Sequence, residues 1–218
     1  MITSTDPIGL MIFLGILSLL PIFFILTTSF IKIAMVMLLA RDSLGVQQIP
    51  PNIVIYGLSL ILSFYIMGPV YNKSYLAVQD DINNGTAITS AVLLKDYAAS
   101  SEGIKQFLIK KSTNNDRIFF YKSLKKFWTP EMMTHVKQDD LIILVPSFMI
   151  SELSQAFKIG FLIYLPSIMI DLIISNMLMA MGMMMMSPVT ISLPIKLLLF
   201  ISLDGWPRLI QVIMNSYS

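Results

Sequence analysis

The chain has 218 residues, of which 56% are hydrophobic and only 13% are charged, and its formal net charge is +2. An ordinary soluble domain carries roughly 25% charged residues, so the composition excludes that class and favours a membrane protein. Cysteine is absent, which excludes disulfides and thiol chemistry, and the small net charge gives no support for nucleic-acid binding.

The first hydrophobic segment covers residues 8–31, and its apolar character resumes after Lys32 as far as Leu39. A membrane-spanning helix needs about 20 mostly apolar residues. Pro21 lies inside the segment, but a proline usually kinks a membrane helix without ending it. The start of the chain also lacks the positive charge of a secretory signal peptide. We therefore predict a retained membrane helix here.

A short polar connector, residues 41–52, leads to the second hydrophobic segment. Its glycine and paired prolines are typical of a turn. Residues 53–70 form the second segment, which Gly68 and Pro69 are expected to close. Together these elements predict an N-terminal hydrophobic hairpin over residues 1–70.

Residues 71–140 differ in kind, because they hold ten basic and eight acidic residues. We predict a solvated, partly helical region, with helix over 91–99 and 103–111 and a loop over 112–116. Aromatic residues alternate with lysines over 119–128, a pattern that favours an amphipathic helix or an interfacial aromatic belt. Stacking on nucleic acid is the other interpretation, and nothing else in the chain supports it.

The C-terminal part, residues 141–218, is a second hydrophobic hairpin. Residues 141–186 are too long for one span, so we expect a helical approach followed by a spanning helix from about Phe157. A turn at Pro188 leads to the last apolar segment, residues 191–203. The predicted fold is all-α: a polytopic membrane protein with about four hydrophobic segments and a polar region between the second and third.

Six charged residues lie in or beside apolar sequence. A charge at the centre of a bilayer costs at least roughly 2.5–3.5 kcal/mol, so such residues pair, face a bundle interior or line a water-filled path. Three interpretations remain: ion pairs within or between subunits, a proton or ion relay, and side chains that reach water at helix ends. We favour ion pairs for the set, which comprises Lys32, Glu152, Lys158, Asp171, Lys196 and Asp204.

An enzyme is not expected. His135 is the only histidine, and without cysteine or a second histidine it makes a poor metal site. There is no glycine-rich phosphate loop, and the serines near Glu152 have no histidine in the same segment to complete a catalytic triad. We therefore predict no catalytic residue, no metal and no cofactor.

Four consecutive methionines, Met183, Met184, Met185 and Met186, lie where one apolar helix gives way to the next. They are either apolar filler or a deformable constriction, since hydrophobic rings can gate a pore and methionine adapts to irregular objects. Successive residues of a helix turn by about 100°, so four methionines cannot share one helical face. Gly182 and Pro188 are expected to open the backbone into a loop at this point.

Several motifs together resemble the FliP/SctR family, the core export-gate subunits of type III secretion systems. In the N-terminal part these are SFIKI (29–33), LG (44–45) and QQIPPN (47–52). In the C-terminal part they are VPSFMISEL (145–153), AFKIGFLIYLP (156–166), IDL (170–172), MGMMM (181–185), SP (187–188), ISLP (191–194), KLLLF (196–200) and DGW (204–206). As a set the motifs are specific, and they leave the middle of the chain unmatched.

The resemblance implies a pore-forming subunit, present in about five copies, that assembles with two smaller export-gate membrane subunits. It also implies contact with a larger membrane protein of the export apparatus, with membrane lipid, and with rod and needle subunits and unfolded substrates in transit. In the family the apolar helices tilt into a cone that lies largely outside the bilayer plane. The alternatives that remain are a proton or ion channel and an assembly scaffold without its own passage.

By resemblance, Met183, Met184 and Met185 match the family's methionine gasket, and Met186 stands where relatives more often have another apolar residue. The chain has neither the cleavable signal nor the longer N-terminus of flagellar members, which favours a virulence injectisome. The charges conflict on orientation, because Lys32 and Arg41 favour a cytoplasmic first connector while the bases of 71–140 favour a cytoplasmic 71–140. The positive-inside rule weakens for loops longer than roughly 60 residues, so we follow the short connector, which puts 71–140 outside the cytoplasm. The resemblance favours a periplasmic 71–140 and a location in the bacterial inner membrane.

Overall fold

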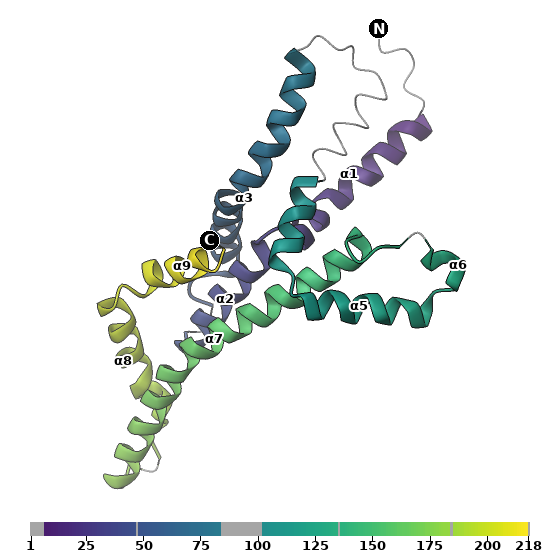
Figure 1. Ribbon diagram of the computed structural model, residues 1–218. Helices are drawn as coiled ribbons and strands as arrows, with labels where there is room; N and C mark the ends of the chain where they lie inside the picture. Colours follow the sequence, from purple (N-terminus) through teal and green to yellow (C-terminus); the bar gives the residue numbers. More distant parts are fainter. Residues whose placement is uncertain (1–6, 47, 84–101, 135, 184, 218) are drawn as a thin grey trace.

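A computed structural model describes residues 7–46, 48–83, 102–134, 136–183 and 185–217 (Figure 1). The described residues fold as helices and contain no strand, which confirms the predicted all-α class. Residues 102–111 are helical. The other helices are α1 (Pro7–Thr27), α2 (Phe30–Ser43), α3 (Asn52–Asn83), α5 (Asn114–Phe127), α6 (Pro130–Met133), α7 (Leu141–Ala180), α8 (Pro188–Ser202) and α9 (Gly205–Asn215).

Two of the described helices are long and apolar enough to cross a membrane, in Asn52–Asn72 and Leu141–Ala180. Two further pairs qualify if each bent pair counts as one span, which gives up to four. The α1–α2 pair bends by 66° and the α8–α9 pair by 64°. The prediction of a polytopic membrane protein is confirmed.

The two bends have local causes. At the end of α1, the Thr27 hydroxyl donates to the carbonyl of Phe23 at 2.8 Å, and the chain turns before α2 begins at Phe30. Between α8 and α9, Asp204 adopts a left-handed conformation with φ of 50°, which a helix interior does not allow. The first apolar segment, expected to run over 8–31, is thus divided between two helices.

Helices α3 and α7 are longer than predicted. α3 passes through Pro69 and continues to Asn83, so the expected end at Gly68 and Pro69 is wrong. α7 is a single helix of 40 residues that contains Pro146 and Pro166, so the expected division near Phe157 is also wrong. A proline removes one backbone hydrogen bond and bends a helix without necessarily ending it, and helix α2, which packs against both α3 and α7, supports the surrounding turns.

The polar region is only partly described. The predicted helix at 103–111 is present, whereas the one at 91–99 lies outside the described residues. The loop expected over 112–116 is shorter, because α5 begins at Asn114. α5 carries the alternating aromatic and basic residues, as the amphipathic-helix interpretation predicts, and it packs against α7.

The core forms where α2 crosses α7, with α3 and α9 alongside (Figure 1). One face of α2 is buried through Ile33, Val36 and Met37, and it meets Phe148 of α7. Close approach requires Gly160, because a Cβ atom at that position would overlap the side chain of Leu39. Away from this crossing the helices separate, and the molecule is extended.

Much apolar surface stays exposed along the separated helices. Ile61 of α3 is 65% exposed, Leu162 of α7 is 65% exposed and Ile201 of α8 is 72% exposed. A soluble monomer rarely exposes large contiguous apolar patches, which mark contact with membrane or with other proteins. The exposed apolar faces of this chain are therefore suited to contact with lipid or with neighbouring subunits.

Candidate functional site

The methionine run forms a tight turn at the tip of the α7–α8 hairpin (Figure 1). The amide of Met183 donates to the carbonyl of Leu178 at 2.9 Å, and that of Gly182 donates to Met179 at 3.0 Å. This pair of bonds is the Schellman pattern that ends a helix. It requires a left-handed residue just after the helix, and Gly182 supplies it with φ of 75°.

The second half of the turn is set by Ser187 and Pro188. Pro188 is the first residue of α8, where its missing N–H costs nothing and its fixed φ suits a helix. The carbonyl of Ser187 accepts the amide of Thr190 at 3.2 Å, which starts α8. The described residues of the run, Met183, Met185 and Met186, therefore lie outside helical structure between Ala180 and Pro188, as expected from the flanking glycine and proline.

The methionine side chains of this turn are exposed. Met183 is 38% exposed, Met186 is 44% exposed and Met185 is completely exposed, while Met184 lies outside the described residues. A hollow of about 290 Å³ lies behind Met183 and Met186 against Leu178. The turn thus presents flexible apolar side chains at the end of the molecule, with room behind them to move.

A buried ion pair joins the two halves of the chain. The Lys32 ammonium on α2 lies 3.1 Å from the Glu152 carboxylate on α7, and both side chains are fully buried. Lys32 also donates to the amide oxygen of Gln155 at 3.0 Å. The Tyr217 hydroxyl donates to the second oxygen of Glu152, and its ring lies under the ammonium at 3.6 Å. The Lys32 and Glu152 charges, both shielded from solvent, are thus compensated by each other and by these polar and aromatic contacts.

Tyr217 and Lys111 extend this cluster to the polar region. The Lys111 ammonium donates to the carbonyl oxygens of Tyr217 at 2.8 Å and Ser216 at 3.4 Å. Burial raises the pKa of the Tyr217 hydroxyl well above its usual value, and the Glu152 carboxylate raises it further. The hydroxyl therefore stays protonated and remains a donor. Burial also lowers the pKa of Lys111, as does neighbouring Lys110.

A second ion pair joins the two legs of the C-terminal hairpin. Lys196 of α8 donates to the Asp171 carboxylate of α7 at 2.6 Å. Lys196 is buried, whereas the Asp171 side chain is 39% exposed. The pair fixes the register of α7 against α8, and through it the position of the methionine turn.

The other two predicted charges lie apart from these pairs. Lys158 and Asp204 are exposed, and neither forms an ion pair within the described part of the chain. The structure thus joins four of the six charges into two pairs. His135 lies outside the described residues, and within those described no group of three potential metal ligands comes together.

The family model for FliP matches residues 13–213, nearly the whole chain. The chain belongs to the FliP family. This confirms the resemblance drawn from the motifs at both ends, and the match also spans the middle, where no motif was recognised.

Relatives of this FliP-family chain match it over almost their full length. It is 48% identical to "Yop proteins translocation protein R" of Yersinia pestis, over 100% of this chain and 99% of the relative. It is 42% identical to "Virulence protein YscR" of Salmonella typhimurium, over 98% of each. It is 40% identical to "Harpin secretion protein HrcR" of Erwinia amylovora, over 97% of each. The names of these relatives refer to translocation, virulence and secretion.

In this FliP-family chain sequence reasoning made no prediction for Tyr217 or Gln155, and it indicated Arg41 only as a charge that bears on orientation. Arg41 holds the connector between α2 and α3, where it donates to Asn52 at 2.5 Å and to the carbonyl of Pro50 at 3.4 Å. Tyr217 had a usable signal, because Leu209, Ile213 and Tyr217 are spaced by four and form one buried stripe. Gln155 had no such signal, because a single uncharged polar residue within a long helix does not indicate a buried hydrogen bond.

Proposed function

We propose that this chain is one of several identical subunits that build the pore of a type III secretion export gate, through which unfolded proteins cross the bacterial inner membrane. The observation that carries the proposal is the methionine turn. Exposed methionines at the tip of a hairpin have no partner in the described monomer, so hairpin tips from several copies would meet one another. The names of relatives, which refer to translocation and secretion, support this proposal.

Methionine suits a seal that has to open for varied substrates. Its unbranched side chain conforms to irregular objects, and a ring of apolar side chains excludes water and ions from a narrow pore. Met183 and Met185 project from a turn instead of one helical face, and Met184 and Met186 extend the same run. The hollow behind Met183 and Met186 gives these side chains room to retract when a polypeptide passes.

The proposed assembly has about five copies of this chain together with two smaller export-gate membrane subunits. A larger membrane protein of the export apparatus lies next to it, and rod or needle subunits and other unfolded substrates pass through it. The region 71–140 lies on the periplasmic side, between hairpins 1–70 and 141–218. Exposed apolar faces on α3, α7 and α8 support both lipid contact and contact between subunits.

Replacing Met183, Met184 and Met185 by alanine tests the gasket. The change shortens three apolar side chains but leaves Gly182 and the helix end intact, so the complex should assemble and the inner membrane should leak small solutes. Met132→Ala on α6 is the matched control, since Met132 is also an exposed methionine but lies far from the turn. Leak is measured as uptake of a small dye or efflux of potassium from cells.

Normal sealing and normal secretion in the triple variant would remove the gasket from the proposal. Crosslinking of a stalled substrate to residues near 183–186 separates a pore from a scaffold without its own passage. A proton or ion channel is the other alternative. It would require the charges to line a water path, whereas Lys32 and Glu152 are fully buried and bonded to each other.

A further inference from the structure

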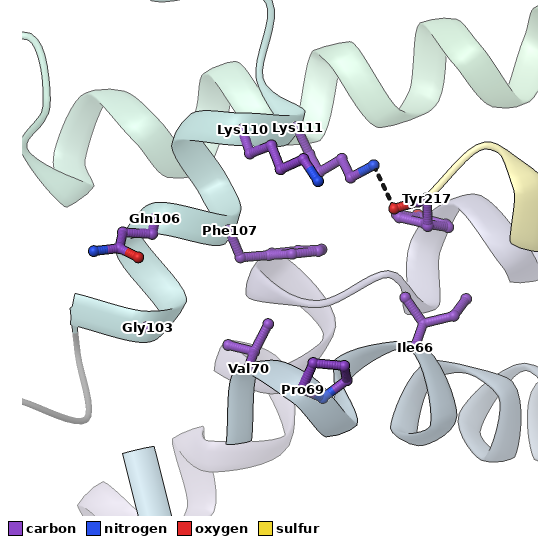
Figure 2. A pocket seen from close by; sticks show the side chains of 9 residues that line it. All are labelled: Ile66, Pro69, Val70, Gly103, Gln106, Phe107, Lys110, Lys111 and Tyr217. Carbon is purple, nitrogen blue, oxygen red and sulfur yellow. Dashed lines mark hydrogen bonds between the residues drawn. The ribbon is translucent and has the colours of Figure 1, made fainter. Parts of the chain in front are cut away.

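A hollow of about 300 Å³ lies between α3 and the helix of residues 102–111 (Figure 2). One wall is apolar and is formed by Ile66, Pro69 and Val70 of α3, which lie in the lower part of Figure 2. The opposite wall carries two ammonium groups, those of Lys110 and Lys111. The space is therefore amphipathic, with apolar and cationic surfaces facing each other.

Two aromatic rings, those of Phe107 and Tyr217, also line this hollow. Phe107 lies between the apolar wall and the lysines, and its ring stacks on that of Tyr217 with centroids 6.4 Å apart. Phe107 also packs against Phe148 of α7 at 5.6 Å. The position of the lysines relative to α3 is thus held by the core.

Within the described residues, none of the nine that line this hollow has an acidic side chain to compensate its positive charge. Lys110 is exposed and forms no hydrogen bond or ion pair within the described residues. Lys111 donates to two carbonyl oxygens, but an ammonium has three N–H donors. Two acidic residues lie close to this lining, and both already have partners: Glu152 is bonded to Lys32 and Tyr217, and Glu102 accepts a hydrogen bond from Gln106 at 3.4 Å.

The hollow also lies at a defined depth along α3. The candidate membrane span of α3 ends at Asn72, so Ile66, Pro69 and Val70 belong to its last two turns. The lysines face these turns from the neighbouring polar region. A phospholipid presents the same order of groups, with acyl chains in the apolar layer and a charged phosphate at its boundary.

We propose that this hollow binds an anionic phospholipid, with its phosphate beside Lys110 and Lys111 and the start of an acyl chain along Ile66 and Val70. The phosphate takes the unused N–H donors of the two lysines. The apolar wall distinguishes a lipid from a free anion, and the lysines distinguish an anionic lipid from a zwitterionic one. The bound lipid would join the end of the apolar part of α3 to the polar region.

The test uses full-length protein extracted in mild detergent together with its accompanying subunits. The sample is washed free of lipid and titrated with short-chain phosphatidylglycerol, and bound lipid is counted by native mass spectrometry. Lys110→Gln should weaken binding about fivefold, the effect of roughly one lysine at an anionic membrane surface. Lys126→Gln, which removes an exposed lysine of α5 outside the hollow, should leave binding unchanged.

Three further arms use the same preparation. Ile66→Trp fills the apolar side while keeping both lysines, so it should also weaken phosphatidylglycerol binding. Equal binding of phosphatidylcholine would overturn the role of the lysines. Inorganic phosphate that competes at the concentration at which the lipid binds would make the hollow a site for free anions. Equal behaviour of Lys110→Gln and Lys126→Gln would likewise overturn the proposal.

Discussion

At the scale of single residues, the buried cluster around Glu152 depends on complete pairing. Lys32 and Tyr217 both donate to the Glu152 carboxylate, and Gln155 accepts a hydrogen bond from Lys32. These residues come from three different parts of the chain. Charges removed from water are tolerable only when each finds a partner of good geometry. Two predictions follow from this arrangement, one for the ion pair and one for the hydroxyl.

Removal of Lys32 alone should be far more damaging than removal of the whole pair. Lys32→Met leaves a buried, uncompensated carboxylate and should destabilise the chain by about 3–5 kcal/mol. The double variant Lys32→Met with Glu152→Gln should recover a large part of this loss, because no charge is then stranded. Thermal unfolding of the detergent-extracted protein gives both values. Equal losses in the single and double variants would contradict a mutual pair.

Tyr217→Phe isolates the contribution of one hydroxyl. The ring stays under the Lys32 ammonium, but one oxygen of Glu152 loses its donor, which should cost about 1–3 kcal/mol. Tyr65→Phe is the control, since Tyr65 is 69% exposed on α3. Midpoints of thermal unfolding should fall for Tyr217→Phe only. A similar fall for both variants would show that the buried hydroxyl has no special role.

At the scale of elements, the turn between α7 and α8 depends on the backbone of one glycine. Gly182→Ala places a Cβ in a left-handed conformation, a cost of about 1–2 kcal/mol, and should displace the methionines that follow. Gly182→Asn should be milder, because asparagine tolerates this conformation. The leak of small solutes should therefore rank alanine above asparagine above the parent chain.

The control for that series is Gly57→Ala in α3, where a Cβ would meet open space in the described chain. It adds the same methyl group within a helix, where alanine is favoured over glycine. A leak in Gly57→Ala as large as in Gly182→Ala would mean that the conformation of the turn does not matter.

The helices could be anticipated to different degrees. The apolar segments and the end of α7 at Gly182 followed from composition and from local turn chemistry. The continuity of α3 through Pro69 and of α7 through Pro166 did not, because packing against other helices decides whether a proline ends a helix.

At the scale of the whole molecule, the chemistry of the site was visible in the sequence, but its connections were not. Six charges in apolar surroundings stood out at once, yet which of them pair depends on the crossing of α2 with α7 and on the register of α8. Lys32 and Glu152 are 120 residues apart in the chain. No local pattern in the sequence links them. The sequence also does not distinguish Lys158 and Asp204 from the four paired charges, although in the fold both are exposed.

The stiffness of α7 can be tested at two exposed positions that lie between Glu152 and the methionine turn, and the matched alanine pair controls for their proximity to Asp171. Leu172 and Ile173 are each 58% exposed, so changing both to glycine removes little packing in the described chain. Glycine is less favourable in a helix than alanine by roughly 1 kcal/mol per residue, so the glycine pair should soften α7. We expect reduced secretion from the glycine pair and near-normal secretion from the matched alanine pair. Equal secretion from the two would show that a stiff α7 is not needed.

Helix α7, with 40 residues, is about 60 Å long at 1.5 Å per residue, roughly twice the thickness of the bilayer core. Glu152 lies near one end, held by Lys32, and about 40 Å of helix separates it from the methionine turn. A tilt of about 5° around that anchor moves the turn by about 4 Å, the scale of a methionine side chain. In the proposed gate the buried ion pair would act as a fulcrum and α7 as a lever, so that a slight rocking of the core would part the methionines.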